Sequence, residues 1–446
     1  MTIRRTKRLA TALILAGLAG VVAAPAPCAA AEKAIWGPLD LPNGQSAFDT
    51  YRALGVDTFQ LQLRWSDTAP SRPADPLNPA DAAYRWPSSV DRAISEAGRR
   101  GIGVALLVTR TPGWANGGRA PTHTPTDAND FAQFVQAASR RYPSVRKWMI
   151  WGEPNSAHQF QPAGAEAPRA YALLLDSAYQ GLKRASRRNI VIGGMTWTGG
   201  DIKPAPFLSR MRLPSGRRPR LDWYGHNPFP FRYPNLREIP TPGGYRDTSD
   251  LDTFSKEIER AYKKPTPLWL SEFTLLSDKR SASFDRFVSQ SEQARWLTAG
   301  FNIADSLPDV AGIGWLSLFD QASGPLSSNF GLMTASGAPK PAYAAFQQAR
   351  NARLRPTVKV ARRVRRTSLR GRGLRVRVRP RQTGRVTVEL RNSKGQRIVR
   401  ASRRFSRLGV RRIALRRKVT LRRGASQLLV RAPGGETVRI KLRVRK

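Results

Sequence analysis

Residues 88–109, SSVDRAISEAGRRGIGVALLVT, contain the pattern that decides the fold of this chain. The first half, Ser88–Arg99, predicts an amphipathic helix, because its apolar residues recur on one helical face: Val90, Ile94 and Ala97. The second half, Gly103–Thr109, is an almost unbroken apolar run, which is typical of a strand buried on both faces. A helix followed directly by a buried strand is the unit from which parallel sheets are built.

The same alternation continues outward from residue 35 to about residue 350. We predict further helices at Ala128–Arg140 and Ala167–Arg184, and eight strands in all: Ile35–Leu39, Thr58–Arg64, Gly103–Thr109, Lys147–Trp151, Ile190–Thr196, Leu221–His226, Pro267–Glu272 and Gly312–Leu318. Eight strands alternating with helices indicate an α/β fold, and a closed (β/α)8 TIM barrel fits that number. An open doubly wound sheet is the alternative, but no glycine-rich phosphate loop follows the first strand.

The basic charge of the chain is concentrated at its C-terminal end. The 446 residues include 76 Lys or Arg and 31 Asp or Glu, which gives a net charge of +45. Residues 357–446 hold 32 of the basic residues but only two acidic ones, Glu389 and Glu436. Apolar residues alternate with arginines there, so we predict a small all-β sandwich of about seven strands, with arginines on its outer faces. A solvated basic tail is the alternative that this alternation disfavours.

The partner of such a basic module is expected to be an anionic polymer, such as an acidic cell-wall polymer. Nucleic acid is not expected as a specific partner, because no aromatic residues lie among the arginines to stack on bases. Coding bias toward arginine is the alternative source of this charge.

The N-terminal residues have the pattern of an export signal. Basic residues at 4–8 precede the apolar run Leu9–Ala24, and small residues follow up to Ala31. We therefore predict a signal peptide over 1–31, a secreted or cell-surface protein, and a barrel domain over 32–352. Because Cys28 is the only cysteine, a disulfide scaffold and a cysteine-built zinc site are excluded.

Two glutamates lie where the predicted barrel would have its functional end. Glu153 follows the fourth strand in IWGEPN (150–155), and Glu272 ends the seventh strand in LSEF (270–273). Barrel enzymes react at the C-terminal ends of their strands, and strands four and seven can face one another across the mouth. Two carboxylates in one cleft suit the cleavage of a glycosidic bond. Each glutamate alone could also be a strand-end polar residue or a helix cap.

With these motifs the chain resembles the retaining glycoside hydrolases of clan A, including β-xylosidase and cellulase-like barrels of the family 39-like and family 5-like branches. The resemblance covers roughly residues 35–350 and implies a carbohydrate substrate, an oligo- or polysaccharide, with no cofactor. It implies a double displacement, in which Glu272 attacks the anomeric carbon while Glu153 acts first as acid and then as base. The candidate substrate-binding residues are Arg64, Trp114, Asn155, His226 and Trp315. An ordinary structural role is the alternative for each of these five.

Two positions depart from the clan pattern. Most members carry Asn directly before the acid/base Glu, where its amide bonds the sugar 2-hydroxyl, but this chain has Gly152. Many relatives have Tyr near strand six, but this chain has Phe229, which cannot donate a hydrogen bond to the nucleophile. These departures leave open a non-catalytic carbohydrate-binding or anionic-surface-binding protein on a degenerate barrel. We expect no metal site, because the three histidines lack ligand spacing: His123, His158 and His226.

Overall fold

The computed structural model describes residues 31–281, 284–321, 328–349, 357–379, 384–405, 410–432 and 437–445. Except for Ala31, the predicted signal peptide lies outside these residues, as does the expected boundary between the barrel and the sandwich. Within the described ranges, no helix is both long enough and apolar enough to cross a membrane.

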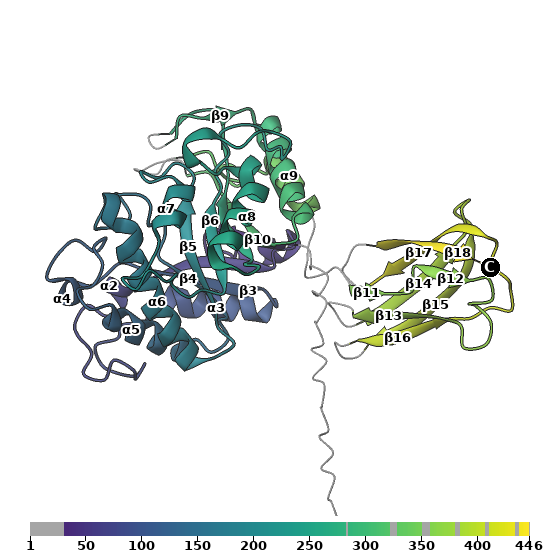
Figure 1. The fold of residues 1–446 in the computed structure, drawn as a ribbon, viewed down its shortest axis with the longest axis horizontal. Helices are drawn as coiled ribbons and strands as arrows, with labels where there is room; N and C mark the ends of the chain where they lie inside the picture. The colour runs from purple at the N-terminus through teal and green to yellow at the C-terminus, as the bar shows by residue number, and fades with distance from the viewer. Residues whose placement is uncertain are drawn as a thin grey trace, which may run out of the picture.

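Eight parallel strands close into a barrel, which confirms the predicted (β/α)8 architecture (Figure 1). In chain order they are β1 (Glu32–Trp36), β2 (Thr58–Arg64), β3 (Gly103–Thr109), β4 (Lys147–Ile150), β5 (Ile190–Trp197), β6 (Trp223–Asn227), β7 (Leu268–Phe273) and β10 (Val310–Leu316). The ring closes where β1 pairs with β10, with Ile35 opposite Trp315. Strand β1 lies nearer the N-terminus than predicted, because Pro38 has no N–H to offer a ladder.

Helices cover the outside of the barrel (Figure 1). They are α1 (Phe48–Ala53), α2 (Trp65–Thr68), α3 (Ser88–Arg99), α4 (Gly113–Asn116), α5 (Ala128–Arg141), α6 (Ala167–Ala185), α7 (Pro204–Arg210), α8 (Leu251–Tyr262), α9 (Gln290–Ser306) and α10 (Pro341–Gln348). Side chains fix where several of them begin. Asp127 accepts a hydrogen bond from the Asn129 N–H at 2.8 Å before α5, and Ser289 with Glu292 forms a capping box before α9.

The interior of the barrel is filled with side chains. Its apolar part consists of Ala34, Trp36, Ala105, Leu107, Met149, Ile192, Met195 and Trp269. Buried Gln60 crosses this interior, donating to the Ser271 carbonyl at 2.9 Å and accepting from the Trp269 indole at 3.0 Å. Near the N-terminal ends of the strands, the Lys147 ammonium contacts the Glu32 carboxylate at 2.7 Å. This packed floor leaves the C-terminal ends of the strands as the place for a cavity.

The described residues of the C-terminal module form an all-β sandwich of eight strands, where the sequence predicts about seven. One sheet contains β11 (Thr357–Lys359), β13 (Leu374–Arg379) and β16 (Arg411–Leu415). The other contains β12 (Arg363–Arg365), β18 (Val438–Arg445), β17 (Gly424–Arg431), β14 (Gly384–Arg391) and β15 (Arg397–Phe405). Aliphatic side chains from both sheets form a single buried cluster, including Val376, Ile413, Val388 and Leu428. Two inner apolar faces account for the period-two pattern of the sequence.

Candidate active site

Both predicted catalytic glutamates line one cavity of about 700 Å³. Glu153 reaches it from the loop after β4, and Glu272 from the end of β7. Four aromatic side chains form an apolar wall: Trp197, Phe229, Phe284 and Phe330. The rest of the lining within the described residues is mainly polar: Ser156, His158, Gln159, Ser281, Ser317, Gln321 and Ser328. The cavity therefore combines two carboxylates, aromatic faces and hydroxyl or amide groups, which suits a sugar ring.

The backbone around Glu153 is held in an unusual conformation. Where β4 ends, the Tyr171 hydroxyl donates to the Ile150 carbonyl at 2.7 Å. Trp151 and Glu153 then adopt left-handed backbone angles, with φ of 60° and 52°. For residues with a Cβ this costs on the order of 1–2 kcal/mol each. The Glu153 N–H donates to the Met195 carbonyl at 3.0 Å, which ties the turn to β5. Such strain is typical of active sites, and here it directs a carboxylate into the cavity.

The two carboxyl groups have different hydrogen-bond environments. The Asn227 amide donates to Glu153 Oε1 at 3.1 Å. Burial raises the pKa of Glu153, and the hydrogen bond from Asn227 opposes that rise. Burial, reinforced by the charge of Glu153, raises the pKa of Glu272 to about 8. Among the described residues, no donor reaches the Glu272 carboxylate. Two interacting carboxyl groups in unlike surroundings can divide the roles of acid and nucleophile.

Several residues of this site are not predicted from the sequence, and Asn227 and Trp197 are the two that contact Glu153 or begin the aromatic wall. Asn227 follows His226 at the end of β6, and that strand-end position was its signal. Trp197 ends β5 in the same way, whereas the sequence predicts Trp114 and Trp315 as the substrate-binding tryptophans. The ring of Trp197 meets Phe229 edge-on at a centroid distance of 6.5 Å. Phe229 in turn stacks on Phe284 at 5.3 Å, so the aromatic wall is continuous.

Arg64 and Trp114 do not line the cavity. The Arg64 side chain is 56% exposed, and its guanidinium lies 4.0 Å from the Asp67 carboxylate. The Trp114 indole donates to the Ala69 carbonyl at 2.8 Å, and the Arg72 guanidinium lies 4.4 Å from its ring centroid. The structure thus gives both residues contacts with the chain near the end of β2.

Asn155, His226 and Trp315 also lie behind the cavity wall. The Asn155 amide nitrogen donates to the Trp197 carbonyl at 2.8 Å, and its oxygen accepts from the Trp197 N–H at 2.8 Å. The Trp315 indole donates to the Phe330 carbonyl at 3.1 Å. Both therefore hold a lining aromatic residue from behind.

His226 is fully buried beneath the loop after β6. Its ring nitrogens lie 2.7 Å from the backbone carbonyls of Thr196 and Arg246. Burial lowers the pKa of His226 to about 4. These contacts join the end of β5 to the loop that carries Arg246.

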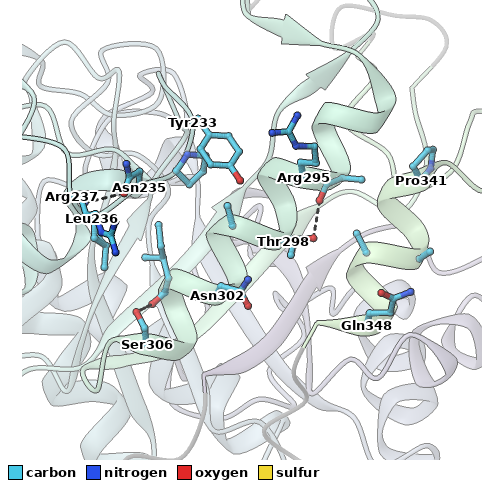
Figure 2. A pocket seen from close by; sticks show the side chains of 16 residues that line it. Tyr233, Asn235, Leu236, Arg237, Arg295, Thr298, Asn302, Ser306, Pro341 and Gln348 are labelled. Carbon is cyan, nitrogen blue, oxygen red and sulfur yellow. Dashed lines mark hydrogen bonds between the residues drawn. The ribbon is translucent and has the colours of Figure 1, made fainter.

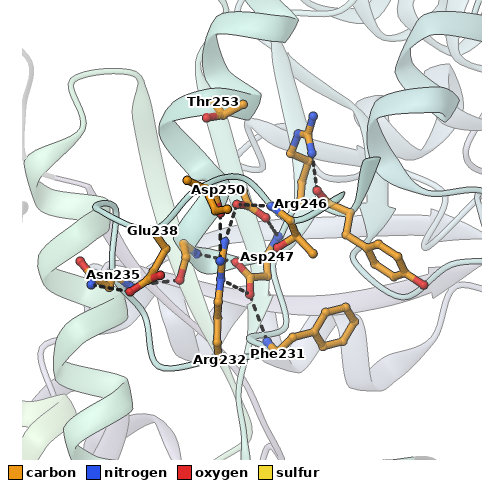
Figure 3. A network of polar contacts seen from close by, with 12 residues as sticks. Phe231, Arg232, Asn235, Glu238, Arg246, Asp247, Asp250 and Thr253 are labelled. Atoms are coloured by element: carbon orange, nitrogen blue, oxygen red, sulfur yellow. Dashed lines mark hydrogen bonds and ion pairs between the residues drawn. The ribbon is translucent and has the colours of Figure 1, made fainter. Parts of the chain in front are cut away.

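A buried ionic network holds the loop that carries Phe229. Figure 3 shows Arg232 between two carboxylates, and its guanidinium lies 3.6 Å from Asp247 and 2.8 Å from Asp250. The Asp247 carboxylate also accepts from the Phe231 N–H at 3.2 Å. Burial and the neighbouring Asp250 raise the pKa of Asp247. The network ties residues 231–232 to residues 247–250 and so fixes the path of the loop beside the cavity.

A second hollow of about 720 Å³ lies on the outside of the barrel, between α9, α10 and residues 233–237 (Figure 2). Its lining includes Tyr233, Arg237 and Arg295. Neither glutamate of the first cavity reaches it, and no acidic side chain is among the described residues that line it. The paired carboxylates therefore single out the cavity at the barrel mouth as the candidate active site.

Comparison with known proteins agrees with this geometry. The model of the family Cellulase (glycosyl hydrolase family 5) matches residues 20–315, and the chain matches no curated protein. A solved family 39 glycoside hydrolase from the gut symbiont Bacteroides cellulosilyticus WH2 is 16% identical, with a TM-score of 0.54 over 86% of this chain and 79% of that chain. A monomeric beta-xylosidase from Caulobacter crescentus CB15 is 15% identical, with a TM-score of 0.52 over 91% and 97%.

At these identities the two solved structures show a shared fold and nothing finer. The family model covers well over half of the chain. Its match, which ends at residue 315, includes both strands whose ends carry the two glutamates. The chain therefore belongs to the Cellulase family, glycosyl hydrolase family 5, and is a glycosidase of clan A.

Proposed function

We propose that this glycosidase hydrolyses β-glycosidic bonds with retention, by double displacement on Glu272. The observation that carries the proposal is the meeting of Glu153 and Glu272 in one aromatic-walled cavity. In the first step, Glu153 protonates the leaving oxygen while Glu272 attacks the anomeric carbon and forms a glycosyl-enzyme. In the second, Glu153 takes a proton from water, and that water releases the sugar from Glu272.

The proton must lie on Glu153 when the reaction begins. In the free enzyme the environment favours the opposite arrangement, because Asn227 donates to Glu153 and no described residue donates to Glu272. Hydroxyl groups of a bound sugar would supply the missing donors to Glu272. Substrate binding would then move the shared proton to Glu153 and make Glu272 the nucleophile.

Turnover of aryl β-xylosides, β-glucosides, β-galactosides and β-mannosides tests the proposal. We expect the wild type to hydrolyse at least one of them, and Glu272→Ala or Glu153→Ala to lower kcat by a factor on the order of 1,000 or more. Glu259→Ala, at an exposed position on α8, is the matched control and keeps full activity. Undiminished turnover by Glu272→Ala would refute the proposed mechanism. Whether the anomeric configuration is retained is decided by NMR, which identifies the anomer of the first product.

The second candidate is a degenerate glycosidase barrel that binds carbohydrate but has lost turnover. Gly152 favours it, because no side-chain amide stands directly before Glu153 to bond a sugar hydroxyl. A Cβ at Gly152 would lie 3.3 Å from Leu107 Cδ2, so a larger residue requires only a small shift of that side chain. Binding of glycans without hydrolysis of any aryl glycoside would support this candidate, whereas any turnover that Glu272→Ala abolishes excludes it.

We further propose that the protein is exported and that its basic module holds it on an acidic surface. The proposal rests on the N-terminal sequence pattern and on the arginine-rich outer faces of the module over 357–446. Sequencing the N-terminus of protein collected outside the cell tests export, with cleavage near residue 31 expected. Retention on cell walls tests tethering, since it should fall as salt rises and after deletion of residues 357–446. Cell-wall retention that changes neither with salt nor after the deletion would refute the tether.

A further inference from the structure

One edge of the five-stranded sheet carries a dense group of cations, which we name the β18 face: Arg363, Arg365, Arg439, Lys441, Arg443 and Arg445. All six side chains are exposed, while the intervening Val364, Leu442 and Val444 are buried. Strands β12 and β18 run parallel and in register. Arginines of the two strands are therefore direct neighbours across the sheet.

The register places like charges opposite one another. Arg363 lies opposite Arg443, and Arg365 lies opposite Arg445. Such cross-strand pairs destabilise a sheet. Glu389 is the one carboxylate in the described part of the sandwich, and it lies on β14, which β17 separates from β18. It is already bound, since Arg391 lies 3.1 Å and Arg400 3.8 Å from its oxygens. The β18 face therefore has no acidic neighbour among the described residues.

Coding bias does not explain this pattern. Residues 1–356 come from the same gene and carry 44 basic residues against 29 acidic ones. Residues 357–446 carry 32 against two, so acidic residues are depleted as well as arginine enriched. A bias toward arginine codons does not remove Asp and Glu from one module and leave them in the other. An anionic partner does account for both changes.

We propose that the β18 face binds a linear acidic polysaccharide that lies along β18. From Arg439 to Arg445 the strand presents a cation about every 7 Å over about 20 Å, and β12 adds a second row about 5 Å away. This spacing suits a chain with regularly repeated carboxylates, which the planar guanidinium fork binds through two parallel hydrogen bonds.

The chemistry of the face also separates this polymer from nucleic acid. The face has no aromatic side chain, and the one aromatic residue of the module, Phe405, is buried. Bases would therefore find no ring to stack on. The choice of a polysaccharide rests on the glycosidase fold of the barrel, whereas the binding of an anion rests on the β18 face alone.

The test compares two full-length proteins that have lost the same charge from different sheets. The first variant removes four arginines from the β18 face: Arg363→Gln, Arg365→Gln, Arg443→Gln and Arg445→Gln. The matched control removes four exposed cations from the three-stranded sheet: Lys359→Gln, Arg375→Gln, Arg377→Gln and Arg412→Gln. Both carry Glu272→Ala so that no probe is hydrolysed, and both are checked for an unchanged circular dichroism spectrum and thermal unfolding.

Binding to polygalacturonate is then measured at several salt concentrations. We expect the β18-face variant to bind on the order of 10- to 100-fold more weakly and with a shallower salt dependence. The control should lose less than about threefold. Equal losses in both variants would overturn the proposal in favour of net charge alone. Equal binding of a fully methyl-esterified polygalacturonate, or tighter binding of duplex DNA at the same salt, would overturn it as well.

These outcomes are separate from the fate of the proposed activity. Binding is measured on a protein that lacks Glu272, so a failure to find hydrolysis leaves the result unchanged. Conversely, the four arginine substitutions of the β18 face, made in a protein that retains Glu272, should leave turnover of small aryl glycosides unaltered even where polygalacturonate binding is lost.

Discussion

At the scale of single residues, the raised pKa of Glu272 predicts an upper pH limit for the proposed hydrolysis. Burial and the charge of Glu153 raise its pKa to about 8, and burial raises the pKa of Glu153 as well. The pair therefore holds one proton around neutral pH and loses it as the pH rises past about 8. We expect kcat/KM for an aryl glycoside to fall above that pH, because no catalytic acid remains. Rates that stay constant to about pH 10 would contradict this assignment.

The same carboxyl group links stability to pH. The pKa of Glu272 is 4.5 in an ordinary setting and about 8 in the fold, so the folded state binds this proton more tightly. The stability that this bound proton contributes to the fold is fully present below pH 4.5 and is lost as pH rises to about 8. Glu272→Gln should therefore raise the free energy of unfolding at pH 9 by on the order of 2 kcal/mol, and by less at pH 4. Urea unfolding at both pH values measures the difference, with Glu259→Gln as control.

Asn227 is a positioning residue for Glu153. Its amide nitrogen donates to Glu153, while its buried side-chain oxygen has no hydrogen-bond partner among the residues that the structure describes. Asn227→Leu removes the donor at similar size, so the pKa of Glu153 rises and the basic limb of the pH profile moves upward. We expect kcat/KM to fall on the order of 10- to 100-fold. A purely structural role of Asn227 would lower activity without moving the basic limb of the pH profile. Asn302→Leu, at an exposed site on α9, is the control.

At the scale of elements, the loop after β6 depends on one arginine. The Arg232 guanidinium is paired with Asp247 and Asp250, whose side chains are fully buried. Arg232→Leu leaves two buried carboxylates without their cation, and we expect a loss of about 3 kcal/mol in the free energy of unfolding. Adding Asp250→Asn should restore part of it by removing one charge. Denaturant unfolding of both variants measures this, and no recovery in the double variant would contradict the expected repulsion.

The elements also show why the fold was predictable and much of the site was not. Strand β3 matches its predicted bounds because its apolar run is defined by burial on both faces. Glu153 and Glu272 were found because a strand end fixes the place of a side chain whatever its neighbours are. The position of Trp114 depends instead on a hydrogen bond to Ala69, a residue 45 positions away. Loop contacts at such separations leave no periodic pattern in the sequence.

At the scale of the whole molecule, the charge of the basic module opposes its own folding. Residues 357–446 carry 32 basic residues against two acidic ones, and arginines face one another across its sheets. Screening this repulsion should stabilise the sandwich. We expect the thermal unfolding transition of the module, followed by calorimetry on the full-length protein, to move upward between low salt and about 0.5 M salt. A downward shift would show that ion pairs outweigh repulsion there.

The packed floor of the barrel also governs how molecules travel through the enzyme. Gln60 and Trp269 fill the interior beneath the two glutamates, and the Lys147–Glu32 ion pair lies deeper still. Because packed side chains fill the barrel beneath this cavity, we expect substrate and product to enter and leave it from the C-terminal side of the barrel. In the proposed double displacement, the departing aglycone and the incoming water would share that side of the barrel, so a bulky aglycone that leaves slowly would delay hydrolysis of the glycosyl-enzyme.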